Sequence, residues 1–329
     1  MNETLGVLET AGERLEITCA IPWVTDLIAE GAADELVRDG AGASLEVRVQ
    51  ADRTPFDTRG WPLLTRGAWS SGEQVVLENA CTSGFDIHVD CSSSVARFTA
   101  RWRPPARDRA AARLLRSRFH LLARCALIQY PALWWAGVRG RVPLHASACG
   151  TEATTALLAG PSGVGRSTLV LREVESGSRT TGDNLSVSDA TSVWGLVEPM
   201  RVEGGNGRRM PHGRHEACLR GRAGSLVPEC VIVLRRGSSA DAELRPCSAE
   251  EAARDLVTST YAAGELRRYW AFAAALAAGT GVGPAHPPIT EVANALAAAL
   301  PCRTLMFTRS PQKRLSQILT ADMEVEAWA

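Results

Sequence analysis

Lysine is almost absent from this 329-residue sequence. Lysine and arginine together number 36, and Lys313 is the only lysine among them. Arginine carries a planar, delocalised charge with five N–H donors, whereas lysine carries a compact ammonium. Because the chain uses arginine nearly everywhere, an arginine in a motif that ordinarily holds lysine is weak evidence against that motif here.

The sequence also lacks a net charge. The 36 basic residues are matched by 36 acidic residues, so the formal charge is zero. Non-specific attraction to nucleic acid or to an anionic membrane depends on a surplus of basic residues. We therefore expect no nucleic-acid partner.

A disulfide framework and a membrane span are missing as well. The nine cysteines are scattered, odd in number and form no C-x-x-C, which indicates reduced thiols. The most apolar stretch, residues 119–138, holds His120, Arg124, Gln129 and Pro131, which favours a buried or amphipathic helix. The first residues carry no basic segment followed by an apolar core, so we expect no signal peptide. These features predict a cytoplasmic protein with no membrane partner.

The length predicts two domains, over residues 1–138 and 139–329, each with its own core. The first is expected to be strand-rich (α+β), with a helix over 24–38 and a long connecting helix over 107–135. In the second, strands alternate with helices, which predicts an α/β layer around a central sheet. The expected strands are 13–18, 44–49, 73–77, 95–100, 141–147, 178–187, 230–234 and 303–307, and the later helices are 249–278, 289–300 and 311–319.

The strongest motif joins an apolar run over 155–159 to a segment over 167–171 that can open a helix. The glycines between them allow a backbone curl in which successive N–H groups and the positive helix end surround a polyphosphate. Ser167 stands where a hydroxyl would coordinate magnesium. The alternative is a glycine-rich turn without a ligand. The loop residues are Gly160, Pro161, Ser162, Gly163, Val164, Gly165, Arg166, Ser167 and Thr168.

Two further segments flank the loop at fixed spacings. His145 lies fifteen residues before Gly160, and the pair Asp183-Asn184 begins sixteen residues after Ser167. This pattern, over roughly residues 140–190, resembles the C-terminal kinase domain of HPr kinase/phosphorylase. It is more closely similar to the HPr-kinase-like enzymes found with ribosomally made peptide pathways, such as lasso-peptide kinases.

The resemblance implies a P-loop kinase domain of the HPr kinase and phosphoenolpyruvate carboxykinase type. It implies ATP with Mg²⁺, and transfer of the γ-phosphate to a serine, or a threonine, hydroxyl of a peptide or small protein such as a ribosomal peptide precursor. It also suggests a homo-oligomer. By elimination, the strand-rich first domain would recognise the acceptor or mediate assembly.

The resemblance also implies roles for single residues. Asp183 would be the general base that takes the proton of the acceptor hydroxyl, and His145 would lie close to it and to the transferring phosphate. Arg166 would supply the charge that lysine gives elsewhere, and Ser167 would bind magnesium. Positioning and charge neutralisation should carry most of the rate in such a transfer.

Two residues depart from the family pattern. Arg166 replaces the lysine of G-x-x-x-x-G-K-[ST], and Asn184 replaces a second acid. Asn184 would offer magnesium a carbonyl oxygen in place of a carboxylate, and Glu198 or Glu203 is an alternative source of the missing charge. A second hypothesis therefore stays open: a catalytically impaired nucleotide-binding scaffold or regulator of a biosynthetic pathway.

An arginine- and glycine-rich loop over 201–222 is a second candidate site. Its residues Arg208, Arg209 and Arg214 are of the type that grips a phosphate, an acidic peptide or a developing transition-state charge. The alternative is a solvated basic loop.

Overall fold

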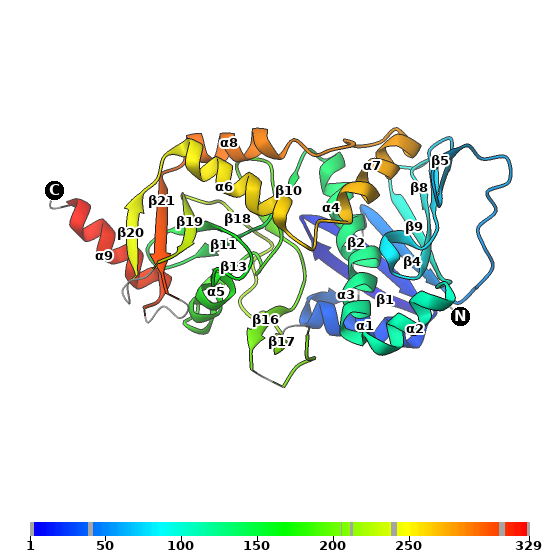
Figure 1. Ribbon diagram of the computed structural model, residues 1–329, viewed down its shortest axis with the longest axis horizontal. Coiled ribbons are helices and arrows are strands. Elements are labelled where there is room, and N and C mark those ends of the chain that lie inside the picture. The colour runs from blue at the N-terminus through cyan, green and yellow to red at the C-terminus, as the bar shows by residue number, and fades with distance from the viewer. Residues whose placement is uncertain are drawn as a thin grey trace. The chain divides into compact units, whose positions relative to one another are not determined.

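The computed structural model describes residues 3–38, 42–204, 206–210, 213–237, 242–308 and 313–327, and it divides the chain into two compact units (Figure 1). Both units mix helices with strands, in agreement with the expected α/β class. The first division falls at residue 140, but two later segments return to unit 1, which the sequence pattern does not indicate. Unit 1 comprises Met1–Gly140, Asn206–His215 and Arg268–Pro287, and unit 2 comprises Arg141–Gly205, Glu216–Arg267 and Pro288–Ala329.

Unit 1 is built on a mixed nine-stranded sheet in the order β3-β1-β2-β4-β9-β8-β7-β6-β5 (Figure 1). Alternation of buried and accessible residues explains its strands: in β2, for example, Leu15, Ile17 and Cys19 are buried. The strands are β1 (Glu3–Thr10), β2 (Glu13–Cys19), β3 (Leu36–Val37), β4 (Leu45–Gln50), β5 (Leu63–Thr65), β6 (Ala68–Ser71), β7 (Gln74–Leu77), β8 (Phe85–Asp90) and β9 (Ala96–Trp102). Its helices include α1 (Pro22–Ala32) and α7 (Tyr269–Thr280).

The expected connecting helix over 107–135 is interrupted twice. Helices α2 (Ala106–Leu114) and α3 (Arg116–Arg124) are separated at Leu115, whose backbone is not helical (φ −114°, ψ 54°). A π-helical turn then precedes α4 (Tyr130–Val138), near whose start Pro131 cannot donate a backbone hydrogen bond. No helix in the described ranges is long and apolar enough to cross a membrane.

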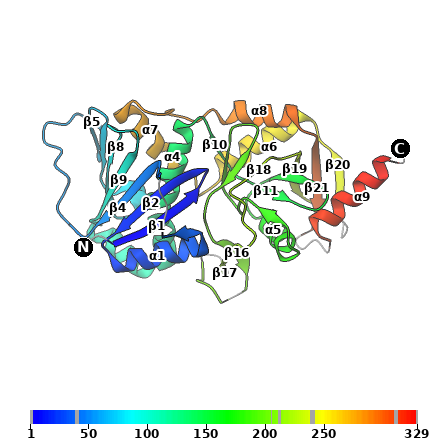
Figure 2. The same ribbon diagram turned by 180° about the vertical axis from the view of Figure 1, so that it is seen from behind.

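Unit 2 contains a six-stranded sheet in the order β13-β11-β12-β19-β21-β20, in which β12, β19 and β21 run parallel. A smaller sheet has the order β10-β14-β15-β18, and its edge strands β10 and β18 are labelled in Figure 2. The strands are β10 (Val142–Leu144), β11 (Ala146–Gly150), β12 (Thr155–Ala159), β13 (Arg179–Thr180), β14 (Ser186–Ser188), β15 (Val193–Gly195), β16 (Met200–Glu203), β18 (Ser225–Leu226), β19 (Cys230–Arg236), β20 (Glu243–Pro246) and β21 (Cys302–Phe307), and β17 (Arg214–Ala217) spans the division between the units.

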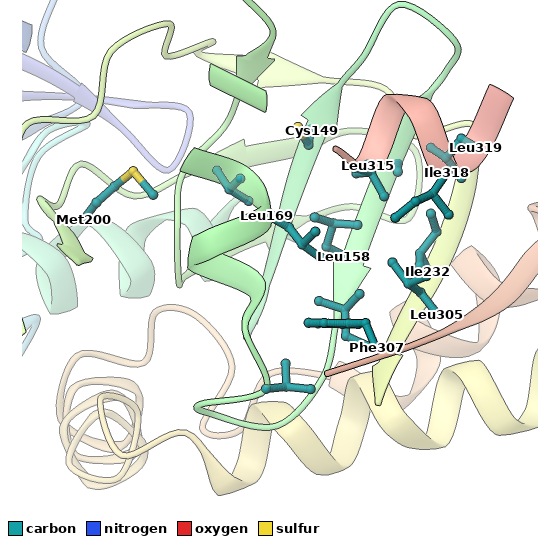
Figure 3. Close-up of a cluster of buried hydrophobic side chains, with 14 of the residues drawn as sticks. Cys149, Leu158, Leu169, Met200, Ile232, Leu305, Phe307, Leu315, Ile318 and Leu319 are labelled. Atoms are coloured by element: carbon teal, nitrogen blue, oxygen red, sulfur yellow. The ribbon is translucent and has the colours of Figure 1, made fainter. Parts of the chain in front are cut away.

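Helices cover both faces of the six-stranded sheet. On one face, α6 (Ala249–Ala262) contacts β12, β19 and β21, and α8 (Ile289–Ala299) packs against α6. On the other, α5 (Arg166–Glu175) and α9 (Leu315–Ala327) share a buried apolar cluster with the strands (Figure 3). Burial of each large apolar side chain of this cluster contributes about 1.5–3 kcal/mol to the stability of the fold. The cluster includes Leu158, Leu169, Ile232, Leu305, Phe307, Leu315 and Ile318.

Three further expected elements are divided in the structure. The strand expected over 141–147 breaks at His145, and the strand expected over 178–187 forms only at its two ends, as β13 and β14. The helix expected over 249–278 is two helices, α6 in unit 2 and α7 in unit 1. The first two breaks place His145 and Asp183, which the sequence singles out, outside regular strands.

Candidate functional site

The glycine-rich loop lies between β12 and α5, beside the parallel neighbour β19. Ligand sites of α/β sheets commonly form at such carboxyl ends of strands. Gly165 precedes α5 with φ 115°, and a Cβ there would lie 2.8 Å from Cε2 of Phe307. Any other residue at this position would be strained and would collide with the ring. The strand, loop and helix order predicted from the motif is therefore present.

The loop offers backbone and hydroxyl groups to a ligand. Pro161, Ser162 and Gly163 are exposed, and Ser167 and Thr168 are half-buried in the first turn of α5. Within the described residues no side chain caps that turn. The first N–H groups of a helix have no partners inside it, so such a turn can bind an anion.

Arg236 contacts the glycine-rich loop, and the sequence pattern does not reveal it. It ends β19, is exposed, and its Nη2 donates to the carbonyl oxygen of Gly163 at 2.8 Å. Its guanidinium also lies over the ring of Phe307, 5.8 Å from the centroid. The signal that could have found it is its place at the end of a strand parallel to β12, where the carboxyl ends of both strands meet.

His145 lies at the point where the chain passes from one sheet to the other. Leu144 pairs with Ser186 in the small sheet, whereas Ala146 pairs with Ala159 in the large one. Since Ala159 is the residue before Gly160, this register brings His145 to the start of the loop. The backbone N–H of His145 donates to Thr260 Oγ1 at 3.0 Å, which ties this crossing point to α6.

Asp183 and Asn184 occupy an irregular turn that is held against β11. The hydroxyl of Ser147 donates to the carbonyl oxygens of Gly182 (2.6 Å) and Asp183 (2.8 Å). On the other side of the turn, a Cβ on Gly195 would lie only 1.6 Å from the carbonyl oxygen of Thr181. The turn can therefore form only because residue 195 is glycine, and it places both polar side chains beside His145.

Arg166 joins these segments, and it is fully buried. Its Nη1 donates to the backbone carbonyl of His145 at 2.8 Å, and its Nε donates to that of Asp183 at 3.1 Å. Its Nη2 lies 2.8 Å from Nε2 of His145 and 3.1 Å from Oδ1 of Asn184. All three guanidinium nitrogens are thus engaged inside the protein. In this arrangement the charge that Arg166 was expected to supply in place of lysine is directed at groups of the protein itself.

Three side-chain atoms of the cluster are buried and lack a hydrogen-bond partner within the part of the chain that the structure describes. They are Nδ1 of His145, Oδ1 of Asp183 and Nδ2 of Asn184. Leaving such atoms without partners costs about 1–3 kcal/mol each. The Asp183 oxygen suits a cation or a hydroxyl donor, so the residues present fit both a magnesium ion and an acceptor alcohol. Oδ1 of Asn184 fits magnesium less well, because Arg166 already donates to it.

Buried charges surround this cluster. Arg201 donates to Glu265 at 2.5 Å, and Glu198 accepts from the backbone N–H of Leu185 at 3.2 Å. Burial raises the pKa of Glu198 to about 7, with the carboxylates of Glu265 and Asp183 adding to the shift and Arg201 opposing it. Of the two acids considered as replacements for the missing carboxylate, Glu198 therefore lies at the site, whereas Glu203 is exposed.

The imidazole of His145 is held neutral. Its side chain is 1% exposed, and burial together with the positive charge of Arg166 lowers the pKa of His145 to about 4. A neutral ring has one donor and one acceptor nitrogen, which lets His145 orient its neighbours without adding charge.

The arginines of the second candidate segment belong to unit 1. Arg208 donates through Nε to Glu30 at 2.9 Å and forms an ion pair with that carboxylate. The carbonyl of Arg209 accepts from Ser117 Oγ at 2.7 Å, and that of Arg214 accepts from the N–H of Met210. None of these contacts involves the glycine-rich loop over residues 160–168, so the three arginines do not support the site in unit 2.

No protein-family model matches this sequence, and no curated protein is similar to it. Across the described residues, no group of three or more histidine, cysteine, aspartate or glutamate side chains is arranged to hold a metal ion. A magnesium ion would therefore take most of its ligands from water, hydroxyl, amide or phosphate oxygens.

Proposed function

We propose that unit 2 is a P-loop phosphotransferase of the HPr kinase type, which transfers the γ-phosphate of ATP to a serine hydroxyl of a peptide or small protein. One observation carries this proposal: the buried His145 and Asp183 and the half-buried Asn184 converge at the loop, and each has a buried polar atom without a partner among the described residues. Such unsatisfied groups are rare in native structures and concentrate where a ligand or reaction uses them.

Asp183 would act as the general base. As the acceptor oxygen bonds to the γ-phosphorus, its proton passes to the Asp183 carboxylate, and the nucleoside diphosphate leaves with the electrons of the broken P–O bond. The loop N–H groups and Arg236 would bind the phosphate oxygens. Ser167, with Asn184 as a weaker ligand, would hold Mg²⁺, which when bound neutralises charge on the phosphates.

A second function is favoured by Arg166. Its guanidinium is buried, and its nitrogens are engaged by His145, Asp183 and Asn184 rather than by a phosphate. A nucleotide-binding scaffold that performs no transfer would have this property. The chemical difference between the two functions is whether a phosphorylated product forms.

Transfer is tested with the full chain, Mg²⁺-ATP and a set of serine-containing peptides, with the mass of each peptide as the readout. The kinase proposal predicts a gain of one phosphoryl group that is lost in Asp183→Asn, a change that keeps the shape of the side chain. Asp189→Asn is the matched control, because Asp189 follows β14 at the surface, where it accepts hydrogen bonds from Thr191 and Ser192. Nucleotide binding without any phosphorylated product would support the scaffold.

A further inference from the structure

A cavity of about 420 Å³ lies in unit 1. Its walls come from α1, α2, α3, the end of β9 and the segment that contains Arg208. The volume is within the range of sites that hold a small ligand or a few side chains of a peptide. The site in unit 2 uses none of its residues.

One wall of the cavity is aromatic. The rings of Trp23 and Trp102 lie 5.3 Å apart, and the ring of Phe119 lies 5.6 Å from Trp23 and 6.4 Å from Trp102. All three side chains are half-buried, so each packs into unit 1 and still lines the cavity. Packing of a large apolar or aromatic side chain of a ligand against such a wall is favourable.

His120 adds a buried polar group to this wall. It is 8% exposed and it lines the cavity. Burial and the positive charge of Arg208 lower the pKa of His120 to about 4, so the ring is neutral at pH 7. It can therefore donate one hydrogen bond to a ligand and accept another.

The rim of the cavity is predominantly basic. Four arginines and two carboxylates line it, and one carboxylate, Glu30, is already paired with Arg208. Arg109, Arg113 and Arg116 are exposed, and none of them forms an ion pair with the described residues. The charge left for a ligand is positive, because only Asp26 opposes these three arginines.

The spacing of the arginines matches an extended acidic segment. Arg109 and Arg113 are four residues apart on α2, so their Cα atoms lie about 6 Å apart along the axis. Residues on the same side of an extended peptide recur every two positions, about 6.6 Å. A single phosphate would instead call for arginines that converge on one point.

We propose that this cavity binds an acidic peptide segment in which carboxylates flank one aromatic or large apolar side chain. The side chain lies against Trp23, Trp102 and Phe119, and the carboxylates meet Arg109, Arg113 and Arg116. If unit 2 is a peptide kinase, this segment is the docking sequence of its acceptor. That last clause rests on the proposed function, but the binding itself does not.

Fluorescence anisotropy of the full chain with a labelled peptide tests the proposal. The peptide alternates glutamate with alanine around one central tryptophan. We expect binding that weakens as salt is added, and Arg113→Glu should weaken it by about tenfold or more through like-charge repulsion. Arg107→Glu is the matched control, because Arg107 is exposed on the same helix, is paired with Asp108 and does not line the cavity.

Two further probes separate the contribution of the aromatic wall to peptide binding from that of the arginines. A peptide with alanine in place of the central tryptophan should bind more weakly, and Phe119→Leu should reduce this difference while leaving the fold intact by circular dichroism. The proposal is overturned if the wild-type chain does not bind the acidic peptide, if a lysine-containing version binds as tightly, or if Arg113→Glu has no effect. It is equally overturned if AMP displaces the peptide, since the cavity would then be a nucleotide site.

ATP binding is measured on the same samples. If the wild-type chain binds ATP but not the acidic peptide, only the docking proposal is contradicted. Peptide binding without ATP binding contradicts the proposed function of unit 2 alone.

Discussion

At the scale of single residues, the site depends on how Arg166 is satisfied. A fully buried guanidinium is tolerated only where its N–H groups meet acceptors, and here the acceptors belong to the three residues expected to perform the chemistry. Arg166 is therefore a positioning residue for His145, Asp183 and Asn184. Its planar fork is what reaches all of them at once.

Replacing Arg166 with lysine tests this positioning. Lysine keeps the charge but cannot donate to the carbonyls of both His145 and Asp183, so we expect the free energy of unfolding to fall by about 1–3 kcal/mol. Urea denaturation at pH 7 measures it. Arg179→Lys, at an exposed position of β13, is the control and should change stability by less than about 0.5 kcal/mol. Equal stability of both variants would contradict the role given to Arg166.

The raised pKa of Glu198 predicts how the free energy of unfolding changes with pH. Its pKa is raised from 4.5 to about 7 in the folded protein, so between these values the unfolded chain releases a proton that the folded chain retains. This group therefore lowers the free energy of unfolding as pH rises from 4.5 to 7, by up to about 3 kcal/mol. His145 acts in the opposite direction between pH 4 and 6.5, because its pKa is depressed.

Comparing a Glu198 variant with the wild-type chain isolates the contribution of Glu198 to the pH dependence of the free energy of unfolding. Glu198→Gln should gain stability relative to wild type as pH rises from 4.5 to 7, measured by urea denaturation at several pH values. Glu203→Gln, at an exposed position nearby, should show no such trend. A difference for Glu198→Gln that stays constant with pH would show that Glu198 is not held protonated.

At the scale of elements, the loop and the turn that carries Asp183 were predictable to different degrees. The loop was predicted because its glycines, its preceding strand and its following helix are adjacent in the sequence. The break at His145, the irregular turn and Arg236 depend on pairing between distant strands, which a local pattern does not contain. The burial of Arg166 was missed for the same reason, since its acceptors lie on three different segments.

The loop conformation can be tested at two glycines. Gly165→Ala places a Cβ 2.8 Å from Phe307 at φ 115°, whereas Gly163→Ala meets no atom within 4 Å at φ 79°. Both changes introduce backbone strain, but only the first adds a collision. We expect Gly165→Ala to cost about 1–3 kcal/mol more than Gly163→Ala, measured by thermal denaturation. Equal costs would mean that the Phe307 contact does not constrain the loop.

At the scale of the whole chain, the two units offer different chemistry. Unit 2 has the glycine-rich loop with the buried side chains of His145 and Asp183 beside it, and unit 1 has a basic, aromatic-walled cavity. This division agrees with an enzyme that binds its nucleotide and its acceptor with separate units. The chain passes between the units more than once, which the sequence pattern did not predict because contacts between distant segments define the units.

Hydrogen exchange can localise nucleotide binding to one unit. With Mg²⁺-ATP present, we expect slower amide exchange over 160–168 and 181–185, because a ligand suppresses local opening of the segments that hold it. The strands β2 and β4 of unit 1 serve as the internal control and should exchange at unchanged rates. Protection confined to unit 1 would place the nucleotide elsewhere.

The most direct test of the central claim is calorimetric titration of the full chain with ATP, with and without Mg²⁺. We predict that the wild-type chain binds ATP, that Mg²⁺ strengthens this binding, and that Ser167→Ala removes most of the magnesium-dependent part. If a folded wild-type chain binds no ATP under either condition, the loop between β12 and α5 is not a nucleotide site, and both the kinase and the nucleotide-binding scaffold are wrong.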